Sequence, residues 1–209
     1  MDILKDLFYF GNSHITVLFG IIVFLWILWG LRPGFQAIRH LKITEPDEEA
    51  VKQLAQAIRS TVDNYKTPLT ILTGKTLYDA YKAHKQATMP IFLKALEDST
   101  EQIMENFFEN RYIRPISMYS NLLPPIGFIG TIIGMILVFS TKGATGSQVN
   151  ATGLGVALLS TLYALSGFVV IEIIKMWFVN RASHCIDNGI KLFYVFIEGH
   201  YKAEQKKGN

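Results

Sequence analysis

Residues 115–141 read PISMYSNLLPPIGFIGTIIGMILVFST, and residues 143–171 read GATGSQVNATGLGVALLSTLYALSGFVVI. Neither stretch contains a charged residue, and only Lys142 separates them. A helix needs about 20 predominantly apolar residues to cross the hydrocarbon core of a bilayer. Both stretches exceed that length, so we expect two membrane-spanning helices joined by a short turn.

A third charge-free run covers residues 7–31. Its part 15–31, ITVLFGIIVFLWILWGL, is bulky on every face of a helix and predicts a span that faces lipid. The chain has 209 residues and is 50% hydrophobic, which excludes an intrinsically disordered chain. The predicted fold class is therefore an all-α integral membrane protein, with three transmembrane helices and long helical extensions into a cytoplasmic helical domain.

The basic residues predict the orientation. Of 20 Lys and Arg, twelve lie in 32–115 and six lie in the tail from residue 172. Basic residues gather at cytoplasmic ends of spans, so we expect both segments inside and the N-terminus outside. The first run also has the apolar character of a signal peptide. Asp2 and Asp6 oppose that alternative, as does the lack of a small-x-small cleavage site before Arg32, so a retained anchor is favoured.

The predicted organisation follows from these runs. It comprises an N-terminal outer segment with the first transmembrane helix (1–33), a cytoplasmic helical domain (34–115), the second transmembrane helix (116–140), a periplasmic loop (141–150), the third transmembrane helix (151–176), and a cytoplasmic C-terminal helix and tail (177–209). In a membrane protein the net charge of +3 says little about nucleic acid, and we expect a lipid bilayer and no nucleic acid as partner.

Helical periodicity extends into the cytoplasmic part. We expect Arg32-Pro33-Gly34 to end the first helix, an amphipathic helix over 44–65, a less regular segment over 66–86 and a second long helix over 89–114. The third span is expected to continue as one helix past the membrane. The stripe that indicates this continuation is Phe178, Ala182, Cys185, Gly189, Phe193 and Phe196. Packing against the other cytoplasmic helices is the favoured explanation of the stripe, ahead of a cofactor site.

The second and third spans carry small and polar residues at intervals of three or four. In the second span they are Ser120, Pro124, Gly127, Thr131, Gly134 and Val138, and in the third they are Gly153, Ala157, Ser160, Ala164, Gly167 and Ile171. Such stripes let helix backbones approach closely in lipid. Packing within one subunit explains part of this pattern, but two stripes exceed what three helices need, and we infer an oligomer. The predicted packing or pore-facing residues are Gly127, Gly130, Gly134, Gly153, Ala157, Ala164 and Gly167.

Four polar residues of these spans are candidates for lining an ion path, namely Thr131, Ser160, Thr161 and Glu172. At about 1.5 Å per residue, Thr131 and Thr161 lie at nearly the same depth in antiparallel helices. Each threonine alone commonly bonds back to its own helix. Glu172 follows Thr161 by eleven residues, so it lies only about 20° from the azimuth of Thr161. Glu172 either lies at the mouth of the path or is an interfacial residue paired with Lys175.

Motifs for other chemistry fail. Gly74-Lys75-Thr76 resembles the end of a phosphate-binding loop, but Leu69 stands where that motif requires Gly. The five histidines have no metal-ligand spacing, and no catalytic set is evident. We therefore expect a protein that is not an enzyme and has no metal and no cofactor.

Two motifs resemble a known family. Residues 125–136, PIGFIGTIIGMI, contain G-x-x-G-T-x-x-G-M and so resemble the P-x-x-G-x-x-G-T-x-x-G-M signature of the MotA/TolQ/ExbB proton-channel family. Residues 157–165, ALLSTLYAL, resemble its A-L-x-x-T-x-x-G-L signature. The three-span topology is similar to the ExbB and TolQ branch. The resemblance implies a pentamer around a dimeric, single-span partner of the ExbD, TolR or MotB kind. The resemblance further implies that an Asp of that partner carries the proton and that Thr131 and Thr161 face its path.

The sequence departs from the family pattern at three places. Val156 stands where ExbB and TolQ carry Glu, Ala164 replaces the Gly of the second motif, and Phe168 and Val170 replace an A-I-P sequence. No carboxylate lies at the depth of the two threonines, and a hydroxyl cannot hold a proton at neutral pH. A partner is therefore expected to supply the acid.

Two functions remain at this point. The first is an ion-driven motor subunit of the bacterial inner membrane that translocates H⁺ or Na⁺ and does mechanical work at the cell envelope. The second is a structural membrane scaffold that conducts no ions. The sequence leaves open the choice between H⁺ and Na⁺, and also whether uptake, envelope maintenance, motility or defence is driven.

Overall fold

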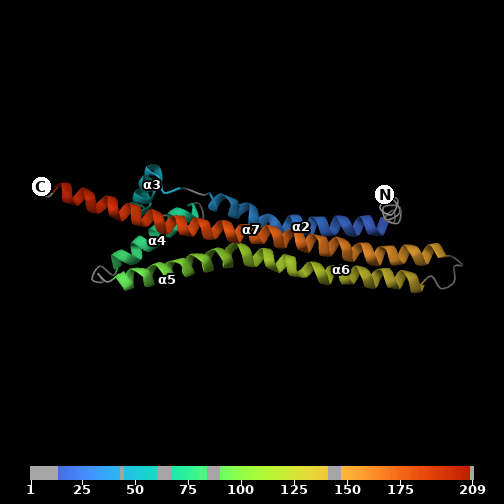
Figure 1. The fold of residues 1–209 in the computed structure, drawn as a ribbon. Helices are drawn as coiled ribbons and strands as arrows, with labels where there is room; N and C mark the ends of the chain where they lie inside the picture. The colour runs from blue at the N-terminus through green and yellow to red at the C-terminus, as the bar shows by residue number, and fades with distance from the viewer. Residues whose placement is uncertain (1–13, 43–44, 61–66, 84–89, 141–146, 208–209) are drawn as a thin grey trace, which may run out of the picture. The chain divides into compact units, whose positions relative to one another are not determined.

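The computed structural model describes residues 14–42, 45–60, 67–83, 90–140 and 147–207, and within these ranges no residue is in a strand. Figure 1 shows long helices with short ones between them. The helices are α2 (His14–His40), α3 (Glu48–Arg59), α4 (Leu69–Ala83), α5 (Pro90–Phe108), the π-helical turn η1 (Glu109–Ile113), α6 (Arg114–Ser140) and α7 (Ser147–Lys207). The predicted all-helical class is confirmed.

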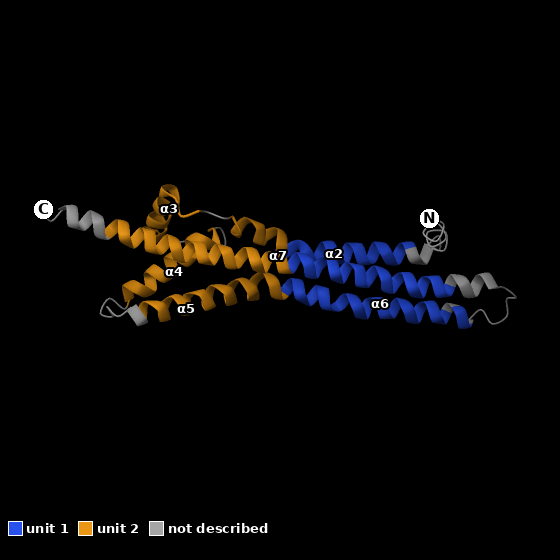
Figure 2. Cartoon of the chain, in the orientation of Figure 1, with its two compact units in different colours: residues 1–33, 115–175 blue, residues 34–114, 176–209 orange. Residues whose placement is uncertain are grey.

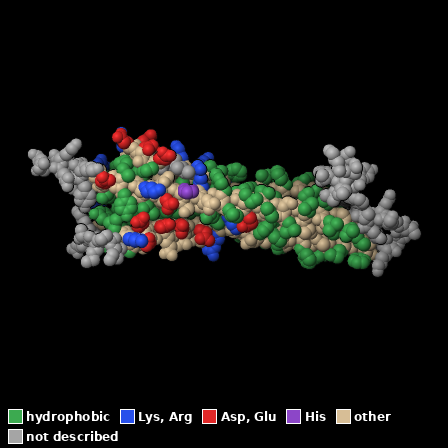
Figure 3. Space-filling view, in the orientation of Figure 1, with side chains coloured by type: hydrophobic (Ala, Val, Ile, Leu, Met, Phe, Trp, Pro, Cys, Tyr) green, Lys and Arg blue, Asp and Glu red, His purple; other side chains and the backbone are tan. Residues whose placement is uncertain are grey.

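Three helical stretches are long and apolar enough to cross a membrane, and they lie in Val17–His40, Phe92–Ile136 and Gly153–His200. The chain divides into two compact units (Figure 2). Unit 1 consists of residues 1–33 and 115–175, and unit 2 consists of residues 34–114 and 176–209. Charged side chains gather over unit 2 on the face shown in Figure 3, whereas the surface over unit 1 is mostly hydrophobic.

The first predicted helix end is wrong. Helix α2 passes through Pro33 and continues to His40. Proline removes one backbone hydrogen bond and does not by itself forbid the following turns. The residues beyond it are held by burial, because Ala37 is fully buried and Leu41 is 2% exposed. The His40 imidazole adds a 3.0 Å hydrogen bond to the backbone oxygen of Thr67.

Unit 2 is built around an apolar core. Helix α3 is shorter than the predicted 44–65 and presents Ala50, Leu54 and Ala57 to that core. Thr44 and residues 61–65 of the predicted helix lie outside the described ranges. Leu192 and Phe196 of α7 complete the cluster. Burial of this apolar face stabilises α3, which would be marginal as an isolated helix of 12 residues.

Helix α4 is regular where we expected an irregular segment. Gly74 lies inside the helix, and a Cβ there would meet the Gly189 backbone oxygen at 3.2 Å. A Cβ on Gly189 would lie 2.6 Å from the Thr70 oxygen. The two glycines therefore allow the backbones of α4 and α7 to approach closely, which is the reason why α4 tolerates a poor helix former.

Helix α7 is one continuous helix of 61 residues, as predicted. Its predicted stripe is buried in unit 2, at Phe178, Ala182, Cys185, Gly189, Phe193 and Phe196. The rings of Tyr78 and Phe196 meet edge to face, with centroids 5.7 Å apart. Packing against the other helices of unit 2, which is the favoured explanation of the stripe, is confirmed.

The π-helical turn η1 is a feature that we did not expect from the sequence. It follows α5 directly and leads into α6, so the predicted helix over 89–114 begins at Pro90 and changes its winding at Glu109. Tyr112 and Ile113 of this turn are buried. Tyr112 packs against Phe108 and His40, with ring centroids 5.2 Å and 5.5 Å away. The wider turn thus places an aromatic side chain inside unit 2.

Two glycines of α7 provide a matched test of this packing. Gly189→Ala places a methyl group against the Thr70 oxygen and is expected to destabilise the protein by about 1–3 kcal/mol. Gly199→Ala, in the same helix with nothing within 4 Å of a new Cβ, is expected to stabilise it by about 0.5–1 kcal/mol. Thermal unfolding of both variants in one detergent measures the difference. Equal effects would contradict the close contact between α4 and α7.

Candidate ion site between helices α6 and α7

Helices α6 and α7 of unit 1 pack through their small residues. A Cβ on Gly134 would lie 2.6 Å from both the Ala157 nitrogen and the Gly153 oxygen. A Cβ on Gly127 would lie 2.7 Å from the Ala164 methyl carbon. These distances are shorter than real contacts allow, so glycine is required at both positions.

The remaining predicted packing residues divide between two contacts. Gly130 faces Ser160 across the same α6–α7 contact. Gly167 instead faces α2, where a Cβ would lie 2.6 Å from the Ile27 terminal methyl carbon. Gly30 of α2 similarly packs against the Tyr119 side chain. Small residues therefore serve both contacts of unit 1.

The two stripes pair with each other within one chain, to a larger extent than we expected. We expected two stripes to exceed the needs of one chain, but Gly127 and Gly134 of one stripe meet Ala164 and Ala157 of the other. Each stripe is the partner of the other inside a single chain. The contacts between the stripes need no second subunit, and the expectation of an oligomer stays a prediction.

Thr131 and Thr161 meet at the centre of this contact. Their hydroxyl oxygens are 2.6 Å apart. The Thr131 hydroxyl lies 3.2 Å from the Gly127 oxygen and 3.3 Å from the Ala157 oxygen. The Thr161 hydroxyl lies 3.2 Å from the Ala157 oxygen and 3.4 Å from the Gly127 oxygen. Each hydroxyl thus reaches the carbonyl four residues back in its own helix and the equivalent carbonyl of the other helix.

These four oxygens, of the two hydroxyls and of the Gly127 and Ala157 carbonyls, form what we call the threonine cluster. Two hydroxyl protons serve four oxygens, so one proton can join the threonines while the other reaches a carbonyl. Both threonine side chains are partly exposed. The cluster can therefore donate to or accept from a polar group on another chain, but it contains no group that holds a charge at neutral pH.

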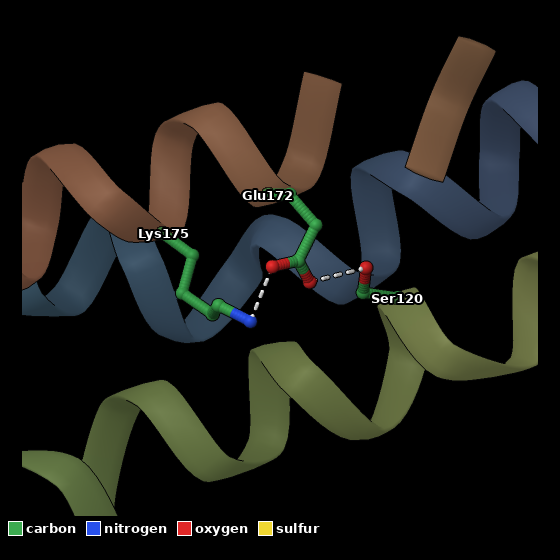
Figure 4. Close-up of polar contacts among 3 residues, drawn as sticks. All are labelled: Ser120, Glu172 and Lys175. Atoms are coloured by element: carbon green, nitrogen blue, oxygen red, sulfur yellow. Dashed lines mark hydrogen bonds and ion pairs between the residues drawn. The ribbon is translucent and has the colours of Figure 1, made fainter. Parts of the chain in front are cut away.

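A second polar contact joins the same two helices (Figure 4). The Ser120 hydroxyl donates to Glu172 Oε1 at 3.0 Å, and Glu172 Oε2 forms an ion pair with Lys175 at 2.5 Å. Ser120 precedes Thr131 by eleven residues, and Glu172 follows Thr161 by eleven. Eleven residues are about three turns, or about 16 Å, in either helix. The two polar contacts therefore lie on one shared helix face.

Two predicted site residues differ in environment from the threonines. Ser160 is fully buried, and its hydroxyl donates to the Ala157 oxygen at 3.0 Å, so it faces the helix contact. Glu172 has the ion pair with Lys175 that we named as its alternative role. Ser120 was recognised only as a small residue of the stripe. The eleven-residue interval, matched in both spans, is the signal that would have identified it as the partner of Glu172.

Gly134→Leu tests the packing that positions the threonine cluster. The added side chain must force α6 away from Ala157, so we expect a loss of about 3 kcal/mol in unfolding free energy. Met135→Leu is the matched control, because Met135 is the next residue and is 47% exposed. Denaturant unfolding of both variants in detergent gives the comparison. A Gly134→Leu protein as stable as the control would contradict the close approach.

The fold and the site define a class before any comparison. The chain is a helical membrane protein in which two spans bring hydroxyl groups and one carboxylate together on one face. The model of the MotA/TolQ/ExbB proton channel family matches residues 69–193, which is more than half of the chain. The chain therefore belongs to the MotA/TolQ/ExbB proton channel family. No curated protein and no solved structure matches it.

Proposed function

We propose that this chain is the channel and motor subunit of an ion-driven complex in the bacterial inner membrane. Five copies surround a dimeric, single-span partner of the ExbD, TolR or MotB kind, and the flow of H⁺ or Na⁺ drives mechanical work at the cell envelope. The N-terminus is periplasmic and the C-terminus is cytoplasmic. Membership of a proton channel family supports the coupling to an ion gradient.

The threonine cluster carries this proposal. It places two hydroxyls 2.6 Å apart in the interior of spans that otherwise pack through glycine and alanine. The only carboxylate in residues 115–175 is Glu172, about 16 Å further along the helix. A proton relay needs a titratable group at the level of the hydroxyls. An aspartate on the partner helix would supply it, with the threonines orienting its carboxyl group.

A second candidate function is a scaffold that conducts no ions. This function is favoured because the polar groups are satisfied within the chain: the Thr131 hydroxyl donates to the Gly127 oxygen and the Thr161 hydroxyl donates to the Ala157 oxygen. Glu172 is likewise neutralised by Lys175. Buried polar groups in a membrane stabilise helix packing when satisfied in this way. The two functions differ in whether the hydroxyls are needed for ion flux.

Removing the hydroxyls separates these functions. Thr131→Val and Thr161→Val keep the side-chain shape and are each expected to abolish partner-dependent ion flux, while the amount of assembled complex stays unchanged. Flux is measured in proteoliposomes that contain the chain and its single-span partner. Thr76→Val is the matched control, because Thr76 of α4 also bonds back to its own helix, at 2.9 Å to the Leu72 oxygen. Wild-type flux in both span variants would favour the scaffold.

The proposed assembly is tested independently of flux. Native mass spectrometry of the detergent-solubilised chain is expected to show a homopentamer. Its α2 helix is expected to face lipid, since Val17, Leu18, Ile21 and Trp29 are all more than half exposed. Single alanine substitutions at Ile21 should therefore leave the pentamer intact. A sample that contains only monomers, with or without the partner, would overturn the proposed stoichiometry.

A further inference from the structure

We propose that Ser120 and Glu172 form a binding site for a monovalent cation of sodium size, and that the Lys175 ammonium fills this site in the conformation described here. The inference deepens the proposed function and rests on it, because it adds a cation site about three helical turns from the threonine cluster. Its test uses neither the partner nor ion flux.

The oxygens of the site are already grouped. Ser120 Oγ lies 3.0 Å from Glu172 Oε1. The other carboxylate oxygen, Glu172 Oε2, forms the ion pair with the Lys175 ammonium. Ser120 is fully buried, whereas the side chains of Lys175 and Glu172 are 23% and 28% exposed to solvent. The site is therefore closed toward α6 and accessible from the side on which Lys175 lies. Carboxylate, hydroxyl and carbonyl oxygens are the ligands that hard cations prefer.

Pro124 removes a helical hydrogen bond next to this group. It lies inside α6 and has no N–H, so the Ser120 carbonyl four residues earlier lacks the helical donor that it would otherwise have. In membrane proteins, carbonyls without helical partners are tolerated where another group satisfies them, and such carbonyls coordinate Na⁺ in transporters. Ser120 therefore has a hydroxyl oxygen in contact with Glu172 and, in its backbone, a carbonyl oxygen without its usual helical donor.

Lys175 behaves as a tethered cation in this arrangement. A carboxylate at the membrane boundary needs a compensating positive charge, and Lys175 provides it from one turn further along α7. The flexible stem of lysine allows its ammonium group to withdraw to water. A cation that enters and displaces Lys175 replaces one positive charge by another, so the charge of the site is unchanged. Removal of this tethered competitor should strengthen cation binding by about tenfold or more.

Lys175→Met tests the exchange directly. We compare thermal unfolding of the full chain in detergent with NaCl and with choline chloride at equal ionic strength, because a ligand that binds the folded state stabilises it. The variant is expected to gain stability in Na⁺ relative to choline, at about one-tenth or less of the Na⁺ concentration that wild type needs. Lys175→Arg keeps the tethered charge and should resemble wild type. Lys175→Met combined with Glu172→Gln should show no Na⁺ effect.

The outcomes are decisive in both directions. A folded Lys175→Met protein that is equally stable in Na⁺ and choline overturns the site, as does a Na⁺ effect that survives Glu172→Gln. If Lys175→Met does not fold, carbodiimide modification of wild type decides, with Glu172 mapped by mass spectrometry. Na⁺ should protect Glu172 several-fold better than choline, and less so in Ser120→Ala. Equal protection by the two cations overturns the site. A negative result leaves the threonine flux test unaffected.

Discussion

The close approach of α6 and α7 is the constraint on which the rest of unit 1 depends. In lipid no hydrophobic gain draws two apolar helices together, so association relies on packing and on hydrogen bonds between them. Gly127 and Gly134 bring the α6 backbone against Ala164 and Ala157 with no room for a methyl group. Only at this separation can Thr131 reach Thr161 at 2.6 Å. The glycines of the family signature therefore set the distance across which its threonines meet.

The same contact explains the spacing of the polar groups. Two antiparallel helices that touch along one face bring polar side chains together only at matched intervals from a common level. The eleven residues between Ser120 and Thr131, and between Thr161 and Glu172, satisfy this condition. Each polar group then finds its partner on the neighbouring helix, as groups in a medium without water require. A shift of either helix by one residue would separate both pairs at once.

What the sequence predicted correctly depends on regular periodicity. Charge-free runs longer than about 20 residues identified the spans, and the stripe from Phe178 to Phe196 identified the continuation of α7. The end of α2 at Pro33 was wrong because burial of Ala37 and Leu41 outweighs one lost hydrogen bond. We did not predict the regular helix α4, because Gly74 is favourable there only through its close contact with Gly189, which is far away in the sequence.

The candidate site, too, was predicted only in part from the sequence. The threonines and Glu172 were evident as polar residues in apolar spans, but their partners were not, because a stripe of small residues does not state which helix it contacts. Because the two stripes pair within one chain, they give no independent support for an oligomer. The proposed pentamer is therefore supported by family membership. The same pairing leaves the outer faces of α6 and α7 free of contact with each other. Phe128, Ile132, Leu158 and Leu162 are exposed there and contain no polar group. In the proposed complex, a partner helix that brings an acid to the threonines would approach along the partly exposed edge of the cluster, because Ser160 at the same level is fully buried.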